Sequence, residues 1–342
     1  MNILLTTVGG LTSPDIIKSL HENEEGRKIR IIGVDPFEFA VGRFFADKFY
    51  KVPYSGKDEE EFIKSLLEII EREKVDVLIP CGNEDVLVIS KNILNFPIPV
   101  MVSEYTYLKK AFDKKEVYSV LQSLKSPLTP KYFVVKERNI FLEAVKELGY
   151  PKVPVCVKPV KGRGGRGVFI LKDTVDFNSL LNTKPTGEIP LDAFLKYLPR
   201  KFPEELIVME YLSEPLYSFY ALTFKGEIRI SLTHLREWGN ASQTFRGKVY
   251  FDSKLQELIS PLVKHFNLSF CINVELGVSR DGQIKLFDLN PRIAASSGVD
   301  RYIGLNFPYL ALKLLLGENI VFPKLENIKG RFIRFFDVVW EE

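Results

Sequence analysis

A basic, glycine-rich segment near the middle of the chain has the composition of a phosphate-binding loop. It spans residues 157–168 and reads VKPVKGRGGRGV after an apolar run. Glycines let backbone N–H groups turn toward a bound anion, and Lys158 at the end of the run can neutralise a phosphate oxygen. No G-K-[ST] closes the segment, so it is not a Walker loop, and a solvated glycine hairpin is the alternative interpretation. The candidate phosphate-binding residues of the loop are Gly162, Arg163, Gly164 and Gly165.

A second segment, residues 286–292 (LFDLNPR), carries side chains suited to a divalent cation. Asp288 and Asn290 lie two residues apart on an expected strand, so both project from one face of a sheet. Glu275, on the preceding strand, can reach the same face. Three oxygen ligands suit Mg²⁺, with Mn²⁺ as a substitute, because Mg²⁺ keeps part of its water shell and is shared with a nucleotide. Arg292 would then stabilise charge on a transferring phosphoryl group, although D-x-N-P-R alone fits a strand end and turn equally well.

A third segment, residues 206–212 (LIVMEYL), has the pattern of a buried strand that ends in polar residues. The exposed backbone of such an end can hydrogen-bond the edge of an adenine ring while apolar side chains enclose the ring. Taken alone, the segment is more simply explained as a core strand. Its position between the other two segments is what makes it a candidate site.

The elements that must position these residues follow two patterns. Apolar runs at residues 3–8, 29–34, 75–80 and 98–102 alternate with helical stripes, which predicts a Rossmann-like parallel sheet with helices on both faces. Gly9, Gly10 and Asp35 have the approximate spacing of a dinucleotide site. However, the G-x-G-x-x-G pattern is missing, so a tight turn beside a polar strand end is the better interpretation.

The second half of the chain is rich in expected strands. Runs at residues 219–224 and 228–233 predict a hairpin around Lys225-Gly226, and runs at 271–278 and 284–289 predict another. The fold class predicted is therefore α/β for the amino-terminal part and α+β for the rest. The sequence alone leaves open whether apolar alternation over residues 332–340 forms an internal sheet edge or a dimer contact.

Composition limits the classes of function. The 342 residues are 46% hydrophobic with a net charge of +3, which gives no reason to expect a nucleic-acid partner. We expect no membrane span, because charged residues, Pro or Gly interrupt every apolar run. The three cysteines lack metal-ligand spacing, which favours reduced, buried thiols. The first residues lack a basic region and a cleavage site, so a cytoplasmic protein is expected.

The three segments, in this order, resemble those of the ATP-grasp superfamily. The resemblance is greatest to single-unit proteins similar to one half of the carbamoyl phosphate synthase large chain, and it runs from the amino terminus to Gly317. It implies an amino-terminal Rossmann-like (pre-ATP-grasp) domain over residues 1–105. A two-subdomain ATP-grasp fold would follow, with the small subdomain over 106–190 and the large subdomain over 191–342.

The resemblance also implies roles for individual residues. Lys114 and Lys158 would hold ATP phosphates beneath a lid formed by residues 161–167. The hinge that contacts adenine would include Glu210, Tyr211 and Leu212. Glu214 would take the place of the ribose-binding glutamate, since Leu216 occupies the position where the family has an acid. The cation would be held by Glu275, Asp288 and Asn290, with Asp288 where glutamate is commoner, and Arg292 would stabilise the transferring phosphate.

The function implied is an ATP-dependent ligase that activates a carboxylate as an acyl phosphate for attack by an amine. Phosphorylation of bicarbonate or carbamate, and a regulatory ATP-binding module without catalysis, are the alternatives. The expected partners are small-molecule carboxylate and amine substrates, and a homodimer is one further arrangement. Candidate substrate contacts are Arg236, Ser296 and Ser297, with a surface ion pair of Arg236 with Glu237 or a nearby acid as the alternative for the first.

Overall fold

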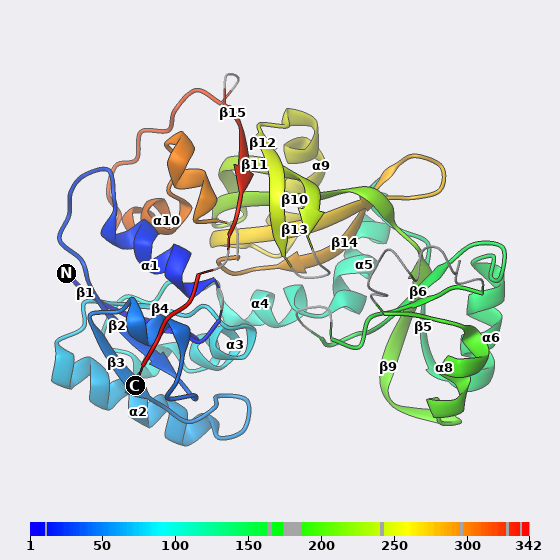
Figure 1. Cartoon of the computed structure of the whole chain (residues 1–342), viewed down its shortest axis with the longest axis horizontal. Coiled ribbons are helices and arrows are strands. Elements are labelled where there is room, and N and C mark those ends of the chain that lie inside the picture. The colour runs from blue at the N-terminus through cyan, green and yellow to red at the C-terminus, as the bar shows by residue number, and fades with distance from the viewer. Residues whose placement is uncertain are drawn as a thin grey trace.

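The computed structural model contains three β-sheets (Figure 1). Residues of all three sheet regions line one cleft. The structure describes the chain except for residues 11, 163–165, 174–186, 240–242, 295–296, 326–327, 336 and 342. Among the described residues, no helix has the length and apolar character needed to span a bilayer. The predicted site residues Arg163, Gly164, Gly165 and Ser296 lie outside the described residues.

The amino-terminal domain is the predicted parallel sheet, with strand order β3-β2-β1-β4. Alternate residues of β1 point to opposite faces, so Ile3 and Leu5 pack with helix α1 and Leu4 packs with helix α2. Both faces are therefore covered by helices, as the apolar runs predicted. The elements are β1 (Asn2–Thr6), α1 (Ser13–His21), β2 (Arg30–Asp35), η1 (Val41–Phe44), β3 (Lys48–Lys51), α2 (Glu59–Glu73), β4 (Val77–Ile79), α3 (Asn83–Lys91) and η2 (Ile93–Asn95).

The small subdomain is a five-stranded sheet of order β5-β9-β6-β7-β8, and helices α6 and α8 pack against it. Strand β9 pairs antiparallel with both β5 and β6. The sheet therefore extends to Glu210, beyond the boundary at residue 190 that we expected from the sequence. The elements are α4 (Tyr105–Ala111), α5 (Lys114–Ser123), β5 (Tyr132–Glu137), α6 (Arg138–Glu147), β6 (Val155–Pro159), β7 (Phe169–Leu171), β8 (Glu188–Ile189), α8 (Leu191–Tyr197) and β9 (Lys201–Glu210).

The large subdomain is a six-stranded antiparallel sheet of order β14-β13-β10-β11-β12-β15. Along β10, Tyr220 and Leu222 join the core shared with α1 and α10, whereas Phe219 and Ala221 face α5 and α9. One face of this sheet thus packs directly on the amino-terminal domain. The elements are β10 (Ser213–Phe224), β11 (Glu227–Gly239), β12 (Thr244–Tyr250), α9 (Ser253–His265), β13 (Phe270–Val278), β14 (Ile284–Asn290), η3 (Val299–Ile303), α10 (Phe307–Leu315) and β15 (Lys329–Ile333).

The carboxy-terminal strand is shorter than expected and starts earlier. β15 pairs antiparallel with β12 and ends at Ile333, so it forms an edge of the six-stranded sheet. After it, the Arg334 guanidinium lies 2.6 Å from the Asp15 carboxylate of the amino-terminal domain. The apolar alternation over residues 332–340 therefore begins, at residues 332 and 333, in an edge strand of this sheet.

Both predicted hairpins are present, and their turn glycines allow a direct test. Gly226 has φ of 80° and Gly282 has φ of 79°, values that favour glycine. A Cβ at position 226 would lie 3.2 Å from the Lys264 Cα, whereas position 282 has open space around it. We expect Gly282→Ala to lower the free energy of unfolding by about 1 kcal/mol and Gly226→Ala by about 2 kcal/mol. Urea unfolding of both variants measures this, and equal losses would contradict the contact at Lys264.

Candidate functional site

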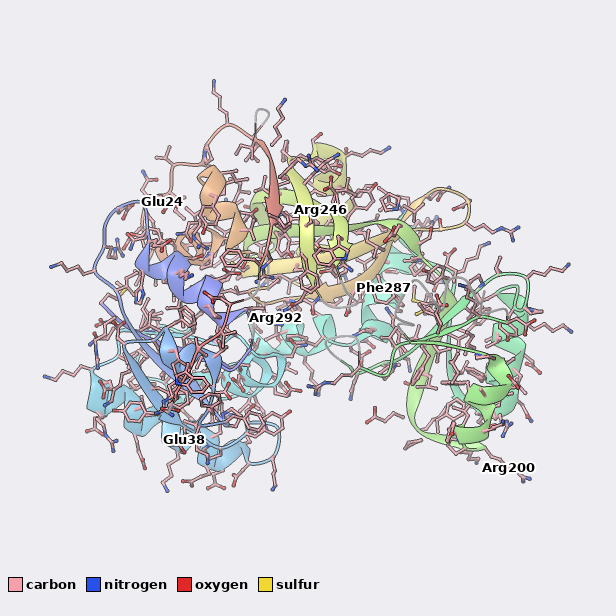
Figure 2. The ribbon with its side chains drawn as sticks, in the orientation of Figure 1. Glu24, Glu38, Arg200, Arg246, Phe287 and Arg292 are labelled. Carbon is pink, nitrogen blue, oxygen red and sulfur yellow. The ribbon has the colours of Figure 1, made fainter. Side chains whose placement is uncertain are left out.

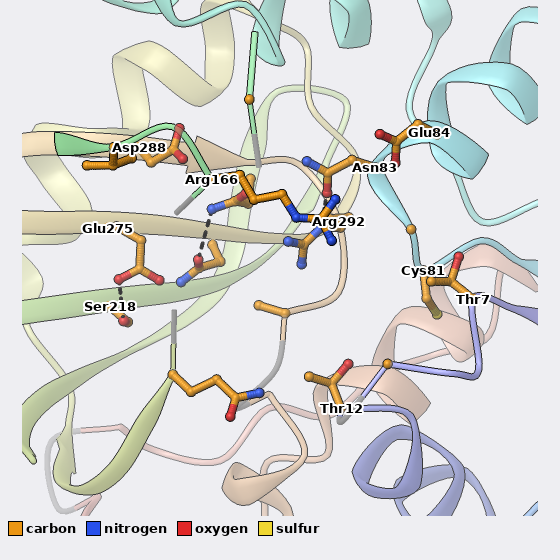
Figure 3. A pocket seen from close by; sticks show the side chains of 18 of the residues that line it. Thr7, Thr12, Cys81, Asn83, Glu84, Arg166, Ser218, Glu275, Asp288 and Arg292 are labelled. Carbon is orange, nitrogen blue, oxygen red and sulfur yellow. Dashed lines mark hydrogen bonds between the residues drawn. The ribbon is translucent and has the colours of Figure 1, made fainter. Parts of the chain in front are cut away.

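A cleft of about 1220 Å³ lies between the three sheets and is lined by residues of all of them (Figure 3). Figure 2 shows Arg292 between the six-stranded sheet and the amino-terminal domain, with Phe287 closer to the small subdomain. The cleft collects most of the residues that the sequence analysis selected, although these are spread over nearly 180 positions of the chain. The predicted site residues that line it are Lys114, Lys158, Gly162, Tyr211, Leu212, Glu214, Arg236, Glu275, Asp288, Asn290 and Arg292.

The predicted cation ligands lie on two neighbouring antiparallel strands in matching register. Glu275 of β13 is opposite Asp288 of β14, and Asn273 is opposite Asn290. Because side chains alternate between faces, these four residues share the face that lines the cleft. The Asn290 amide donates from Nδ2 to Asn273 Oδ1 over 3.4 Å, which keeps Asn290 Oδ1 as a donor atom for a cation. Two carboxylates and an amide oxygen form a hard ligand set that fits Mg²⁺.

Glu275 is held by two polar neighbours. The Ser218 hydroxyl donates to Glu275 Oε2 over 2.7 Å, and the Arg236 guanidinium lies 3.9 Å from the same oxygen. Burial raises the pKa of the Glu275 carboxyl, while Arg236 and Ser218 act to lower it. The alternative for Arg236 was an ion pair with Glu237 or a nearby acid, and the structure pairs it with the acid Glu275. Glu237 pairs with Arg246, Lys248 and Arg331.

Lys114 begins helix α5, and its ammonium reaches across to the cation ligands. Its Nζ donates to the Gly162 carbonyl over 2.9 Å and lies 3.3 Å from Asp288 Oδ1. The helix starts here because the Asp113 carboxylate caps it, accepting from the backbone N–H groups of Lys115 and Glu116. This cap orients Lys114 toward the cleft rather than toward solvent.

Lys158 is a fully buried lysine at the end of β6. Its ammonium donates to the Tyr118 hydroxyl over 2.8 Å and to the Phe287 carbonyl, and it lies 3.7 Å from the centre of the Phe287 ring. Burial lowers the pKa of Lys158 to about 8, against the attraction of Asp288. A buried cation beside Asp288 is therefore available to an anion that enters the cleft.

Arg292 connects the strand end of β14 to the amino-terminal domain. Its Nε donates to Asn83 Oδ1, and its NH1 donates to the Ile293 carbonyl over 2.9 Å. Burial lowers the pKa of Arg292, yet the group stays charged because its ordinary value is so high. The guanidinium is thus held at the cleft by Asn83 of the amino-terminal domain (Figure 3) and by the carbonyl of its own neighbour Ile293.

Two predicted contacts do not line the cleft. The Glu210 carboxylate accepts from the Lys131 N–H over 2.7 Å and holds β9 to the start of β5, whereas the hinge prediction for this residue concerns its backbone groups. Ser297 is buried, and its hydroxyl donates to the Ala294 carbonyl over 2.8 Å. Ser297 therefore closes a local turn and does not line the cleft. Leu216, the residue at the missing acid's position, does line it.

The amino-terminal wall of the cleft uses its acids for structure. Asp35 Oδ2 accepts from the Gly9 N–H over 2.6 Å, and Oδ1 accepts from the Phe37 N–H over 3.0 Å. A Cβ on Gly9 would lie 2.7 Å from the Asp35 carboxylate, which explains the glycine there. The turn interpretation of Gly9 and Asp35 is supported, because the carboxylate is engaged by the backbone. Asp85 likewise accepts from the Thr7 and Ser55 hydroxyls.

Sequence reasoning missed several polar residues of the cleft region, among them Tyr118, Ser218 and Asn273. Tyr118 and Ser218 contact Lys158 and Glu275 from 40 and 57 positions away, so no local pattern pointed to them. Asn273 did have a signal. The pattern N-x-E at residues 273–275 places two polar side chains on one strand face, and it faces D-x-N at 288–290.

Solved structures with the same fold are enzymes that differ widely in sequence. N5-carboxyaminoimidazole synthetase from Staphylococcus aureus, solved with ADP, has 15% identity and a TM-score of 0.64, covering 94% of this chain and 78% of its own. L-amino acid ligase from Bacillus licheniformis has 16% identity and a TM-score of 0.62, covering 92% and 74%. The biotin carboxylase domain of Hydrogenobacter thermophilus 2-oxoglutarate carboxylase has 15% identity and a TM-score of 0.64, covering 94% and 70%.

The chain shares the fold of these enzymes, and residues 202–332 match the family described as an ATP-grasp in the biosynthetic pathway with Ter operon. Both findings support the ATP-grasp resemblance predicted from the sequence. The matched region holds β10 to β14 and so includes Glu275, Asp288, Asn290 and Arg292.

Proposed function

We propose that the protein is an ATP-dependent ligase that joins a carboxylate to an amine with release of ADP and phosphate. The observation that carries the proposal is the register of β13 and β14. This register places Glu275 opposite Asp288 and Asn273 opposite Asn290 on the face that lines the cleft. The Lys114 ammonium lies 3.3 Å from Asp288 Oδ1. The similar enzymes include an L-amino acid ligase and synthetases solved with ADP, which supports ATP as the nucleotide.

The residues divide the work of phosphoryl transfer, which consists mostly of positioning and charge neutralisation. Glu275, Asp288 and Asn290 would hold Mg²⁺, which would neutralise phosphate oxygens of ATP when bound. Lys114, 3.3 Å from Asp288, and Lys158 would bind the phosphates beside the cation ligands. The nucleoside of ATP would be contacted by Tyr211, Leu212 and Glu214. Glu214 would replace the ribose-binding acid.

The proposed reaction has two steps. A substrate carboxylate oxygen attacks the γ-phosphorus, the bond to the β,γ-bridging oxygen breaks, and ADP leaves with that electron pair. The amine nitrogen then attacks the acyl carbon, inorganic phosphate departs, and the amine loses a proton to solvent. Arg292 would stabilise the negative charge on the phosphoryl oxygens during the first step. Arg236, 3.9 Å from Glu275, would bind the substrate carboxylate or the γ-phosphate.

The test is ADP release from MgATP in the presence of pools of carboxylates and amines, with bicarbonate alone as a separate arm. We expect one pool to stimulate release and the double variant Asp288→Ala/Asn290→Ala to abolish that stimulation. Release with bicarbonate and no amine would instead favour the bicarbonate-phosphorylating alternative. Tight MgATP binding without stimulation by any pool would favour a regulatory module and contradict the proposal.

Ser218 offers a prediction about the cation site. Removing its hydroxyl takes away a donor that orients the Glu275 carboxylate, and such supporting bonds are typically worth 10- to 100-fold in metal affinity. We therefore expect Ser218→Ala to raise the Mg²⁺ concentration for half-maximal ADP release about 10-fold. Ser231→Ala is the matched control, because Ser231 is a buried serine on the adjacent strand that donates to Gln256. Equal Mg²⁺ dependence in the two variants would contradict the role of Ser218.

A further inference from the structure

Three large aromatic side chains on the amino-terminal wall of the cleft are exposed to solvent. Phe37 is 72% exposed, Phe39 is 63% exposed and Tyr54 is 40% exposed, and all three line the cleft. Phe37 and Phe39 follow β2, and Tyr54 follows the neighbouring β3, so they come from adjacent strand ends of one sheet. We call these three residues the aromatic wall. Single exposed apolar residues are ordinary, but a group of them inside a cleft marks a ligand site.

Local contacts hold each member of the aromatic wall in place. The Phe37 N–H donates to Asp35, whose other oxygen accepts from Gly9. The Phe39 ring packs edge-on against the Phe44 ring at 5.6 Å. The Tyr54 ring lies over Gly56, where an added Cβ would be 2.9 Å from it. Contacts within the amino-terminal domain thus hold the Phe37 backbone and the Phe39 and Tyr54 rings.

The chemistry of the aromatic wall differs from that of the rest of the cleft. The cations proposed to bind phosphate, Lys114 and Lys158, belong to α5 and β6, and the proposed cation ligands belong to β13 and β14. The amino-terminal domain contributes the three exposed rings of the aromatic wall, beside the acids Asp35 and Asp85, which are engaged within that domain. Trp238 of β11 also lines the cleft and is 54% exposed. A ligand that spans the cleft would thus place charged groups near the two lysines and an apolar group against the aromatic wall.

We propose that the carboxylate or amine substrate carries a large apolar group, best an aromatic ring, which binds the aromatic wall. This inference rests on the proposed ligase function and specifies its substrate class. Aromatic rings pair favourably beyond the burial of their area, so each ring of the wall adds to the preference for an aromatic substrate. Substrates that lack such a group would reach the phosphate side but would be held weakly.

The test compares compounds that differ only by a phenyl ring. ADP release from MgATP is measured with phenylalanine against alanine, benzoate against acetate, and benzylamine against methylamine, each supplied with the complementary pool. We expect at least one phenyl compound to have a KM about 10-fold or more below its partner. In Phe37→Ala/Phe39→Ala that difference should vanish while the KM for MgATP is unchanged. Both rings are exposed, so the melting temperature should not change.

Two controls make the comparison specific. Phe335→Ala removes an 86% exposed phenylalanine that does not line the cleft, and it should leave the phenyl preference intact. Calorimetric titration of the MgADP-loaded protein with the same compounds reports binding without turnover. A heat of binding for a phenyl compound that is lost in the double variant would support the aromatic wall, whether or not any pool stimulates ADP release. The absence of stimulation by every pool would contradict only the ligase proposal.

Several results would overturn the inference while leaving the ligase function standing. Equal KM values within every pair, with normal ADP release, would show that no ring is recognised. A raised KM for MgATP in the double variant, with the phenyl preference retained, would assign the aromatic wall to the adenine ring. A dimer in wild-type protein that becomes a monomer in the double variant, measured by sedimentation, would assign the wall to a second copy of the chain.

Discussion

Arg292→Lys is expected to slow substrate-dependent ADP formation about 1,000-fold while changing the KM for MgATP only a few-fold. The reason is that a guanidinium offers a planar fork to phosphoryl oxygens, whereas an ammonium keeps the charge but loses the paired donors. Arg292 is also held in position by Asn83 and the Ile293 carbonyl, so its geometry is prepared before substrate binds. Steady-state assays over a range of MgATP concentrations separate the effect on kcat from the effect on KM.

The matched control for this prediction is Arg200→Lys in the small subdomain, where the side chain is exposed and outside the cleft (Figure 2). That variant should keep full activity. A loss in Arg292→Lys that appears only as a higher KM would mean that Arg292 binds the ground state and does not act on the transferring group. In that case the catalytic assignment would be wrong, although the site would stand.

Lys158→Met is expected to weaken MgATP binding about 100-fold and, at pH 7, to stabilise the fold. Burial lowers the pKa of Lys158 from 10.5 to about 8, which corresponds to a cost on the order of 3 kcal/mol for keeping the charge in the folded protein. Methionine is unbranched and apolar, so it can fill the same space without this cost. The Tyr118 hydroxyl keeps a partner, since it also lies 2.8 Å from the Phe287 carbonyl.

The sign of the pH dependence follows from the direction of this shift. Between about pH 8 and 10.5 the unfolded chain binds a proton at Lys158 that the folded chain lacks, so wild-type stability gains from this group as pH rises. Below pH 8 Lys158 is charged in the folded and the unfolded chain, so the full free-energy cost of burying this charge lowers the stability of the folded protein. The gap in melting temperature between Lys158→Met and wild type should therefore be largest near pH 7 and shrink toward pH 10.

Lys196→Met, an exposed lysine of α8, is the control and should show neither the affinity loss nor the stabilisation. A Lys158→Met protein that melts below wild type at pH 7 would show that the bonds to Tyr118 and Phe287 outweigh the burial of the charge. Unchanged MgATP affinity, measured by calorimetry, would remove Lys158 from the phosphate site.

The predicted site contacts show that local sequence patterns do not predict which hydrogen-bond partner a side chain takes in the fold. Ser297 looked accessible because it follows Arg292 in a polar stretch, yet its hydroxyl is used by the Ala294 carbonyl three residues away. The Glu210 carboxylate likewise accepts from the Lys131 N–H, 79 residues away, while its predicted place in the hinge concerns the backbone. For both side chains, a hydrogen bond within the fold that no local pattern predicts decided their use.

Strand pairing is likewise set by the fold and not by local sequence. An apolar run predicts that β9 is a strand, but a period of two encodes only which face is buried and not which strand lies beside it. Pairing with β5 and β6 therefore moved β9 into the small subdomain, past the expected boundary. The aromatic wall is a comparable case, because exposure of Phe37 and Phe39 depends on the distant elements that leave the cleft open.

By itself, the sequence determined the parallel amino-terminal sheet, both hairpins and the shared face of Asp288 and Asn290, because backbone periodicity and turn chemistry act over a few residues. It also determined the superfamily, since the order of three short segments is retained in the chain. Only the tertiary structure decided that Tyr118, Ser218 and Asn83 support Lys158, Glu275 and Arg292. Those contacts join positions 40, 57 and 209 residues apart, and such pairs are set by packing and strand register rather than by local pattern.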